Sequence, residues 1–279
     1  MKQLLEKARL GTHRGCKNCP WNPKVVGPIA FGMSCTEHGV DWSTDVKAVS
    51  MQIVQDPAGT TPGKTGRLCF VHNSRNLTDK TAQHAYALWN ATVSFDISDS
   101  IDPHIKNHYW TNALLHGADK EKQKELRKSG PLESARKCCA QLLREQIDLL
   151  TPKVILANGE YAAKSLFDIG YLSTRWNDFK HEFSHGVYRE EFKKSAGETI
   201  LVFCTFHTAI TPIRTHIARL YSPEVQKKLD DRLDKYRKYQ KVQNFLSKYS
   251  PLDSEGKGMR VLLLHWLEIG SAIRAANIP

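Results

Sequence analysis

The stretch Lys47–Phe70, which reads KAVSMQIVQDPAGTTPGKTGRLCF, sets the expected architecture. Its first part, Lys47–Val54, alternates weakly and then becomes apolar, which predicts a buried strand. An acid, two prolines and several glycines follow in one loop that ends on the aromatic residue Phe70. Because glycine has no Cβ, such a loop lets the backbone approach a ligand closely. The stretch therefore predicts a buried strand that leads directly into a binding loop.

Outside this stretch, apolar runs alternate with helical patterns. Further strands are expected at His108–Leu115, Lys153–Ala157 and Thr199–Phe206, and helices at Thr78–Asn90, Leu132–Leu150 and Glu160–Phe167. Because parallel strands need crossover connections, the pattern predicts an α/β fold. We expect a three-layer αβα sandwich around a central, mainly parallel four-stranded sheet. Open sheets of this kind bind ligands beyond the carboxyl ends of their strands, where Gln55, Asn112 and His207 fall.

The two ends of the chain differ from this middle part. Residues 1–45 are rich in Gly, Pro and Cys with little periodicity, which predicts a loop-dominated N-terminal segment. From Ser222 onward the pattern is helical and strongly basic, with a last helix expected at Met259–Arg274. We therefore expect a main domain over 1–221 and a helical C-terminal extension over 222–279. Its basic run fits either a solvated helix face or a surface that follows DNA.

Composition limits the classes of partner. The 279 residues suffice for a sizeable core, and the net charge of +11 favours a polyanion, most simply nucleic acid. Apolar runs such as Val261–Leu264 are far shorter than the ~20 residues that span a bilayer. The charged start Met1–Lys7 has no apolar signal core, so we expect a cytoplasmic protein without a membrane partner. Disulfides are rare there, and the cysteines are expected to be core thiols, metal ligands or reactive groups.

One pair of cysteines has metal-site spacing. Cys16 and Cys19 form a C-x-x-C pair, which predicts a bound metal. Together with Cys35 and His38 the pair gives a C-x2-C…C-x2-H spacing that suits zinc. The other cysteines in apolar contexts, Cys69 and Cys204, are expected to be core thiols.

Two short runs in the opening stretch carry a family resemblance. Gln55-Asp56-Pro57 and Leu68-Cys69-Phe70 resemble the water-activating motif of the uracil-DNA glycosylase superfamily. The family-1 form of that motif reads G-Q-D-P-Y-H and continues through a glycine-rich turn to L-C/A-F. Asn112, in Tyr109–Leu114, is similar to the Asn that ends the second strand in the superfamily. His207 is similar to the first residue of the last motif, although Thr208-Ala209 replaces the usual Pro-Ser.

The resemblance covers roughly Cys16 to Arg214 and implies a monofunctional base-flipping DNA glycosylase. It implies that Asp56 orients the attacking water and stabilises the cationic sugar, and that His207 stabilises the departing base anion. It also implies base-binding roles for Gln55, Phe70 and Asn112, whose amide offers both a donor and an acceptor.

The resemblance also implies contacts with the DNA itself. In the superfamily, the loop after the histidine inserts an apolar tip into the minor groove. Ile210 and Ile213 are suitable wedge residues here, and Arg214 and Lys64 are available for phosphates.

A second part of the resemblance concerns iron. Family 4 of the superfamily holds a four-iron, four-sulfur cluster on four cysteines. Cys16, Cys19 and Cys139 match three of those positions, and His116 stands where that family has the remaining cysteine. Histidine replaces cysteine on some cluster irons, so the resemblance favours a 4Fe–4S cluster over zinc. The neighbouring Cys138 is an alternative to Cys139.

One departure from the family-1 motif bears on the substrate. Ala58 stands where that motif has a tyrosine that excludes substituents at C5 of the pyrimidine. The smaller side chain predicts a pocket for C5-substituted bases: thymine mispairs, 5-hydroxymethyl bases, or the glucosylated hydroxymethylcytosine of phage DNA. The last of these would make the protein a phage-defence enzyme. Family 4 also lacks the tyrosine, which leaves a uracil-selective repair enzyme as the alternative. The sequence is also compatible with a non-catalytic reader of modified DNA and with an RNA-binding module that has a structural metal.

Overall fold

The protein is built around a five-stranded sheet. The computed structural model describes residues 2–20, 30–31, 48–55, 80–92, 108–114, 116–117, 131–184, 186–194, 197–209 and 213–277. The strand order is β3-β2-β5-β7-β6, comprising β3 (His108–Asn112), β2 (Ser50–Val54), β5 (Val154–Asn158), β7 (Thr199–Thr205) and β6 (Tyr188–Lys193). The first four strands are parallel, which confirms the predicted mainly parallel α/β fold.

The fifth strand, β6, was not predicted from the sequence. It pairs antiparallel with β7 at the edge of the sheet. Its side chains alternate between half-buried and exposed, whereas β2 and β5 are buried along their whole length. A polar edge strand of this kind lacks the apolar run that identified the other strands.

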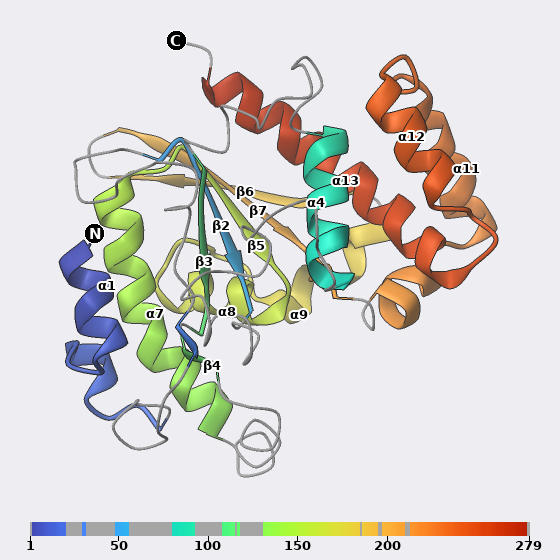
Figure 1. Ribbon diagram of the computed structural model, residues 1–279. Coiled ribbons are helices and arrows are strands. Elements are labelled where there is room, and N and C mark those ends of the chain that lie inside the picture. Colours follow the sequence, from blue (N-terminus) through green and yellow to red (C-terminus); the bar gives the residue numbers. More distant parts are fainter. Residues whose placement is uncertain are drawn as a thin grey trace.

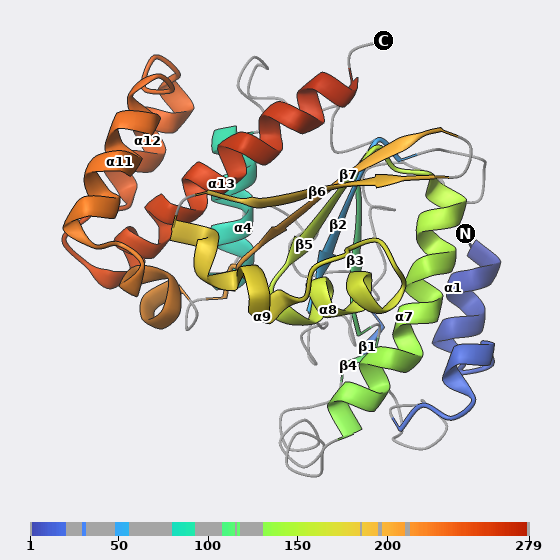
Figure 2. The same ribbon diagram turned by 180° about the vertical axis from the view of Figure 1, so that it is seen from behind.

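Helices cover both faces of the sheet (Figures 1 and 2). On one face lie α7 (Pro131–Leu150) and α8 (Glu160–Asp168), followed by α9 (Trp176–Phe179) and η4 (Lys180–Ser184). Gln146 of α7 is bonded to Tyr109 and Thr111 of β3 across this interface. On the other face lie α4 (Lys80–Thr92) and α13 (Ser254–Asn277), packed against each other. The predicted three-layer arrangement is therefore present.

The C-terminal helices are part of this body. They comprise η5 (Ile213–Ile217), α11 (Pro223–Asp234), α12 (Gln240–Lys248) and α13. Buried α13 residues such as Leu263 and Leu267 belong to the same hydrophobic core as Ile53 and Val202 of the sheet. Trp266 contacts Trp89 of α4 edge to face, with ring centroids 6.2 Å apart. The expected extension is helical, but its last helix completes the core instead of standing apart from it.

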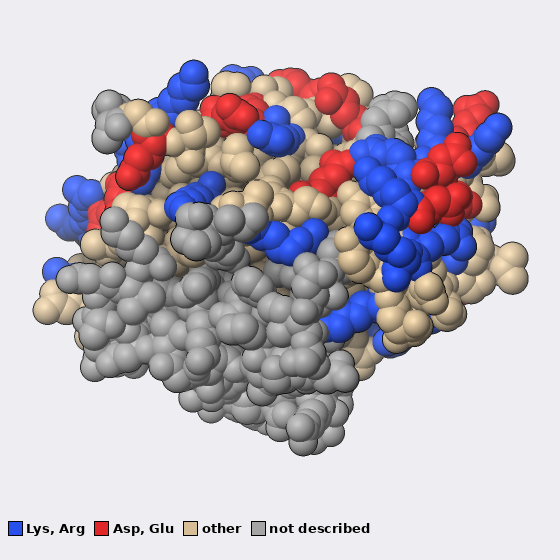
Figure 3. Space-filling view, turned by 90° about the horizontal axis from the view of Figure 1, so that it is seen from above, with Lys and Arg blue, Asp and Glu red and all other residues tan. Residues whose placement is uncertain are grey.

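The basic run lies on α11, on α12 and in the turn between them. Figure 3 shows Lys and Arg gathered at this end of the molecule with acidic residues among them. Arg232 pairs with Glu268, and Arg237 pairs with Asp234 at 2.7 Å. These ion pairs compensate part of the basic charge.

The N-terminal segment packs on α7. It begins with a helix, α1 (Lys2–Arg9), and continues into η1 (Arg14–Cys16), so the loop-dominated prediction was wrong for its first residues. A second, smaller core lies here, formed by Ala8, Cys16, Cys19, Leu114, Leu132, Ala135, Cys139 and Leu142. A two-stranded ribbon pairs β1 (Ala30–Phe31) with β4 (His116–Gly117). None of the helices in the described ranges has the length and apolar character needed to cross a membrane.

Candidate functional site

The sheet brings the predicted site residues to one edge. Asn112 ends β3 and is in register with Val54 of β2, and Gln55 follows directly. The two strand ends are tied together, because Ala113 donates its N–H to the Val54 carbonyl and Leu114 donates to that of Gln55. His207 lies two residues beyond the end of β7. The expectation that Gln55, Asn112 and His207 share the carboxyl edge of the sheet is met.

Asn112 has the surroundings of a ligand-binding amide. Its side chain is 1% exposed, and neither Oδ1 nor Nδ2 has a hydrogen-bond partner within the described structure. Leaving a buried polar group unpaired costs roughly 1–3 kcal/mol. A cost of this size at a strand end is explained if a ligand supplies the missing partners. This is what reading the edge of a flipped base requires.

His207 is held in one tautomer by its own loop. Ala209 donates its backbone N–H to Nδ1 of His207 at 3.1 Å. A neutral imidazole that accepts at Nδ1 carries its proton on Nε2, which is then a donor. The backbone and Cβ of His207 also lie close to the chain after β5. A Cβ on Gly159, where φ is +90°, would lie 3.1 Å from the His207 Cβ, so glycine is needed at this approach.

Several predicted residues lie outside the described part of the chain: Asp56, Ala58, Lys64, Phe70 and Ile210, together with the zinc alternatives Cys35 and His38. Their roles stay predictions. Gln55 is described and half-buried, and it is the residue directly before Asp56.

The two remaining DNA-contact residues have different positions. Ile213 is fully buried in the main core, so in this conformation it is a packing residue and not the predicted wedge. Arg214 is 54% exposed and pairs with Glu255 at 2.7 Å. It lines a cavity of about 570 Å³ together with Lys80 and Lys248. Asp253 and Glu255 line the same cavity, so the phosphate contact of Arg214 stays a prediction.

The cysteines of the predicted metal site come together between the N-terminal segment and α7. Cys16, Cys19 and Cys139 are buried in the small core, with Cys138 packed against it. The pKa of the Cys16 thiol is raised to about 11, mainly by burial and also by the neighbouring thiols of Cys19 and Cys138. A cation bound among these thiols would reverse that effect, because metal ligation favours the thiolate.

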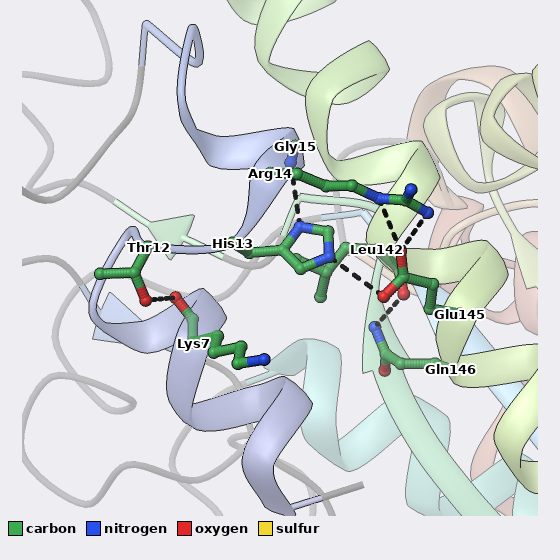
Figure 4. A network of polar contacts seen from close by, with 8 residues as sticks. All are labelled: Lys7, Thr12, His13, Arg14, Gly15, Leu142, Glu145 and Gln146. Carbon is green, nitrogen blue, oxygen red and sulfur yellow. Dashed lines mark hydrogen bonds and ion pairs between the residues drawn. The ribbon is translucent and has the colours of Figure 1, made fainter.

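Polar contacts fix the C-x-x-C segment to α7. Figure 4 shows His13 and Arg14 both directed at Glu145 of α7. His13 Nε2 lies 3.1 Å and Arg14 Nη2 2.7 Å from the carboxylate oxygens of Glu145. A Cβ on Gly15 would lie 2.7 Å from the Cys138 carbonyl, so the segment rests directly on the helix there. This packing holds Cys16 close to the cysteines of α7.

Thiols are suitable ligands for iron or zinc, but the described side chains do not form a complete set of metal ligands. Within the described part of the chain, no group of three or more His, Cys, Asp and Glu side chains is arranged to hold a metal ion. His116 lies on β4, and its side chain is outside what the structure describes. Cys204, by contrast, is fully buried in the main core, as predicted for a core thiol.

One polar residue at this edge was not singled out from the sequence. Asn158 ends β5, between the strands that carry Gln55 and His207. Its signal was present, because it is a polar residue at the end of an apolar run, as Asn112 is.

Comparison with known proteins identifies the family of the chain. No curated protein matches the chain. The family model described as the uracil DNA glycosylase superfamily matches residues 45–216. This region includes β2, β3, β5, β7 and the loop after β7 that carries His207, called the histidine loop below. The matched region spans more than half of the 279 residues, and α11, α12 and α13 lie beyond it. The chain belongs to the uracil-DNA glycosylase superfamily.

Proposed function

We propose that the protein is a monofunctional DNA glycosylase that releases a pyrimidine and leaves an abasic site. Membership of the superfamily supports a glycosylase-type activity on DNA. The observation that carries the proposal is the buried, unpaired amide of Asn112 at the same sheet edge as Gln55 and His207. An enzyme of this kind takes its target base out of the stack and reads its edge in a pocket.

The residues divide the reaction between them. Asn112 reads the edge of the flipped base, which stacks on Phe70, and Gln55 bonds a carbonyl of the base. The C1′–N1 bond breaks and its electron pair leaves on the base, where Nε2–H of His207 stabilises the charge on O2. Water adds to C1′, and its proton passes to the Asp56 carboxylate, which also stabilises the cationic sugar.

The proposed substrate is a pyrimidine with a substituent at C5, including 5-hydroxymethylcytosine and its glucosylated form. Ala58 supports this choice, because alanine leaves room where the family-1 motif has a tyrosine. In phage DNA such bases replace cytosine, which would give the enzyme a role in defence.

The first experiment measures base release by the purified protein. Duplexes with uracil, a thymine mispair, 5-hydroxymethylcytosine or its glucosylated form are compared, and abasic sites are scored by alkaline cleavage. Release only from C5-substituted substrates supports the proposal. Release of uracil alone would identify a repair enzyme, and binding without release from any duplex would identify a reader.

The Asp56→Asn variant tests the mechanism. We expect turnover to fall at least roughly 10²-fold, because the carboxylate that holds water and balances the sugar cation is lost. DNA affinity should stay within about threefold of that of the unaltered protein, measured by fluorescence anisotropy. Arg189→Gln is the matched control, since Arg189 is 51% exposed on β6 and pairs with Glu191. Equal turnover in Asp56→Asn and Arg189→Gln would contradict the mechanism.

We also propose a 4Fe–4S cluster on Cys16, Cys19, His116 and Cys139, with Cys138 as the alternative α7 ligand. The gathering of four thiols from two segments supports it. Such a cluster would supply a structural cross-link between the N-terminal segment and α7. The protein, whether purified with or without oxygen, should contain iron and show the visible charge-transfer absorption of a cluster. The Cys16→Ser variant should lose both the iron and this absorption. Stoichiometric zinc without iron would contradict the proposal.

A further inference from the structure

Asn158 and Asn112 occupy equivalent positions on two strands. Both β3 and β5 are parallel to β2, where Val54 is in register with Asn112 and Ile53 is in register with Ala157. Asn158 therefore lies in the same row across the sheet as Val54 and Asn112. In a parallel sheet, residues of one row point to the same face. The two amides thus flank the end of β2 on one face, roughly 10 Å apart, since neighbouring strands are about 4.8 Å apart.

Asn158 shares the unusual state of Asn112. It is 0% exposed, and neither its Oδ1 nor its Nδ2 has a hydrogen-bond partner in the described structure. Buried side-chain amides normally have partners. Two unpaired amides in one row at the ligand-binding edge of a sheet point to a single ligand that satisfies both.

Gln146 is a buried side-chain amide away from that edge, and it has hydrogen-bond partners. It is also 0% exposed, but its Oε1 accepts hydrogen bonds from Tyr109 and Thr111, both at 2.9 Å. Its Nε2 donates to the Leu142 carbonyl at 3.4 Å. Asn158 differs from Gln146 in that neither of its polar side-chain atoms has a partner in the described structure.

The neighbours of Asn158 place it on the His207 side of the candidate site. Its register partner on β7 is Thr205, two residues before His207. Gly159 donates its N–H to the Thr205 carbonyl at 2.7 Å and approaches the His207 Cβ closely. A base whose edge is read at Asn112 and whose O2 reaches His207 must extend across β2 and β5. Asn158 then lies nearer to O2 than to the opposite end of the base.

We propose that Asn158 is a second oxyanion donor of the glycosylase, which donates Nδ2–H to pyrimidine O2 beside Nε2–H of His207. The proposal rests on the function proposed above and names a further residue of the same site. Negative charge collects on O2 as the C1′–N1 bond breaks, so a donor there stabilises the transition state more than the bound substrate. O2 is common to uracil, thymine and cytosine. Asn158 therefore contributes equally to every pyrimidine and does not select among them.

The test uses Asn158→Leu, which keeps similar volume and removes both polar atoms. Single-turnover base release should fall roughly 10²-fold, by a similar factor on every duplex that the unaltered protein cleaves. A loss confined to one base would overturn the O2 assignment, and an unchanged rate would overturn the whole inference.

Thermal unfolding separates this role from a structural one. Because Asn158 has no partner in the described structure, Asn158→Leu should leave Tm unchanged or raise it. The matched control is Gln146→Leu, in which two hydroxyls lose their acceptor and Tm should fall. A fall in Tm for Asn158→Leu as large as that for Gln146→Leu would overturn the inference.

A binding assay tests the contact between Asn158 and O2 independently of the proposed cleavage reaction. The probes are duplexes with 2′-fluoro-2′-deoxyuridine or its 5-hydroxymethylcytidine counterpart, whose glycosidic bonds resist cleavage, and a duplex with an abasic-site analogue. Asn158→Leu should weaken binding to the pyrimidine probes by about 5-fold or more and leave the abasic probe unaffected. If the unaltered protein cleaves nothing but this loss is seen, the proposed activity fails and the O2 contact stands. Cleavage by the unaltered protein without this loss would reject Asn158 alone.

Discussion

At the scale of single residues, His265 links stability to pH. It is fully buried on α13, where Nε2 donates to the Phe183 carbonyl at 2.7 Å and Nδ1 accepts from the Thr205 hydroxyl at 2.8 Å. Burial, more than any other cause, lowers its pKa from 6.5 to about 4. At pH values between these two pKa values, His265 therefore binds a proton in the unfolded chain but not in the folded protein. Stability should fall by about 3 kcal/mol as the pH drops through this window.

Urea unfolding at pH values from 7.5 to 4.5 measures this loss, with His265→Gln as the comparison. The variant should be less stable at pH 7.5, because it loses a hydrogen bond, but its stability should depend less on pH in that range. An equal pH dependence in the two proteins would show that other groups cause it. Below pH 4.5 a separate loss is expected from Glu255, whose pKa is lowered by His84 and Arg214 against the opposing effect of burial.

The residue scale also shows how far sequence reasoning reached. Asn112 and His207 were recognised because each matched a position in a known motif, and both lie at the predicted edge. Asn158 matched no motif and was not singled out. Its importance depends on register, since only the alignment of β5 with β2 places it in the Asn112 row. Register between distant strands is set by the fold and is not visible in a local pattern.

At the scale of elements, α4 and α13 hold the histidine loop at both of its ends. His84 of α4 bonds the Thr208 carbonyl at 3.1 Å and the Glu255 carboxylate of α13 at 3.0 Å. On the far side of the loop, Ile213 is buried against α13, and Arg214 pairs with the same Glu255. Any wedge at Ile210 is thus carried by a segment whose ends are fixed.

Gly258 tests this arrangement. A Cβ there would lie 2.4 Å from the Ile213 carbonyl oxygen, which is backbone and cannot move aside easily. We expect Gly258→Ala to cost roughly 1–3 kcal/mol, which is a fall of roughly 2–10 °C in Tm by calorimetry. It should also slow base release, because the loop after His207 shifts. Lys257→Ala, at a half-buried neighbouring position, is the control, and equal Tm values for the two variants would contradict the close contact.

The same elements explain where the sequence prediction of the fold stopped. β2, β5 and β7 were found because their apolar runs are buried in the sheet. The helical pattern of α13 was also found, but the basic run before it led to its interpretation as an extension. Its buried residues Val261, Leu262, Leu263 and Leu264 occupy consecutive positions, and a helix that is apolar on all sides is a core helix.

At the scale of the whole molecule, one face of the sheet is covered by α13, which comes after all five strands of that sheet in the sequence. α13 lies on the sheet face that bears Thr205 and contacts α4 through Trp266 and Trp89. Ribosomes synthesise α13 after all five strands, so one apolar face of the sheet stays uncovered until α13 emerges. A nascent chain in this state is prone to aggregation and to capture by chaperones. The protein thus completes its main hydrophobic core only after α13 has left the ribosome, and a chain that stops before α13 lacks the helix that covers this face of the sheet.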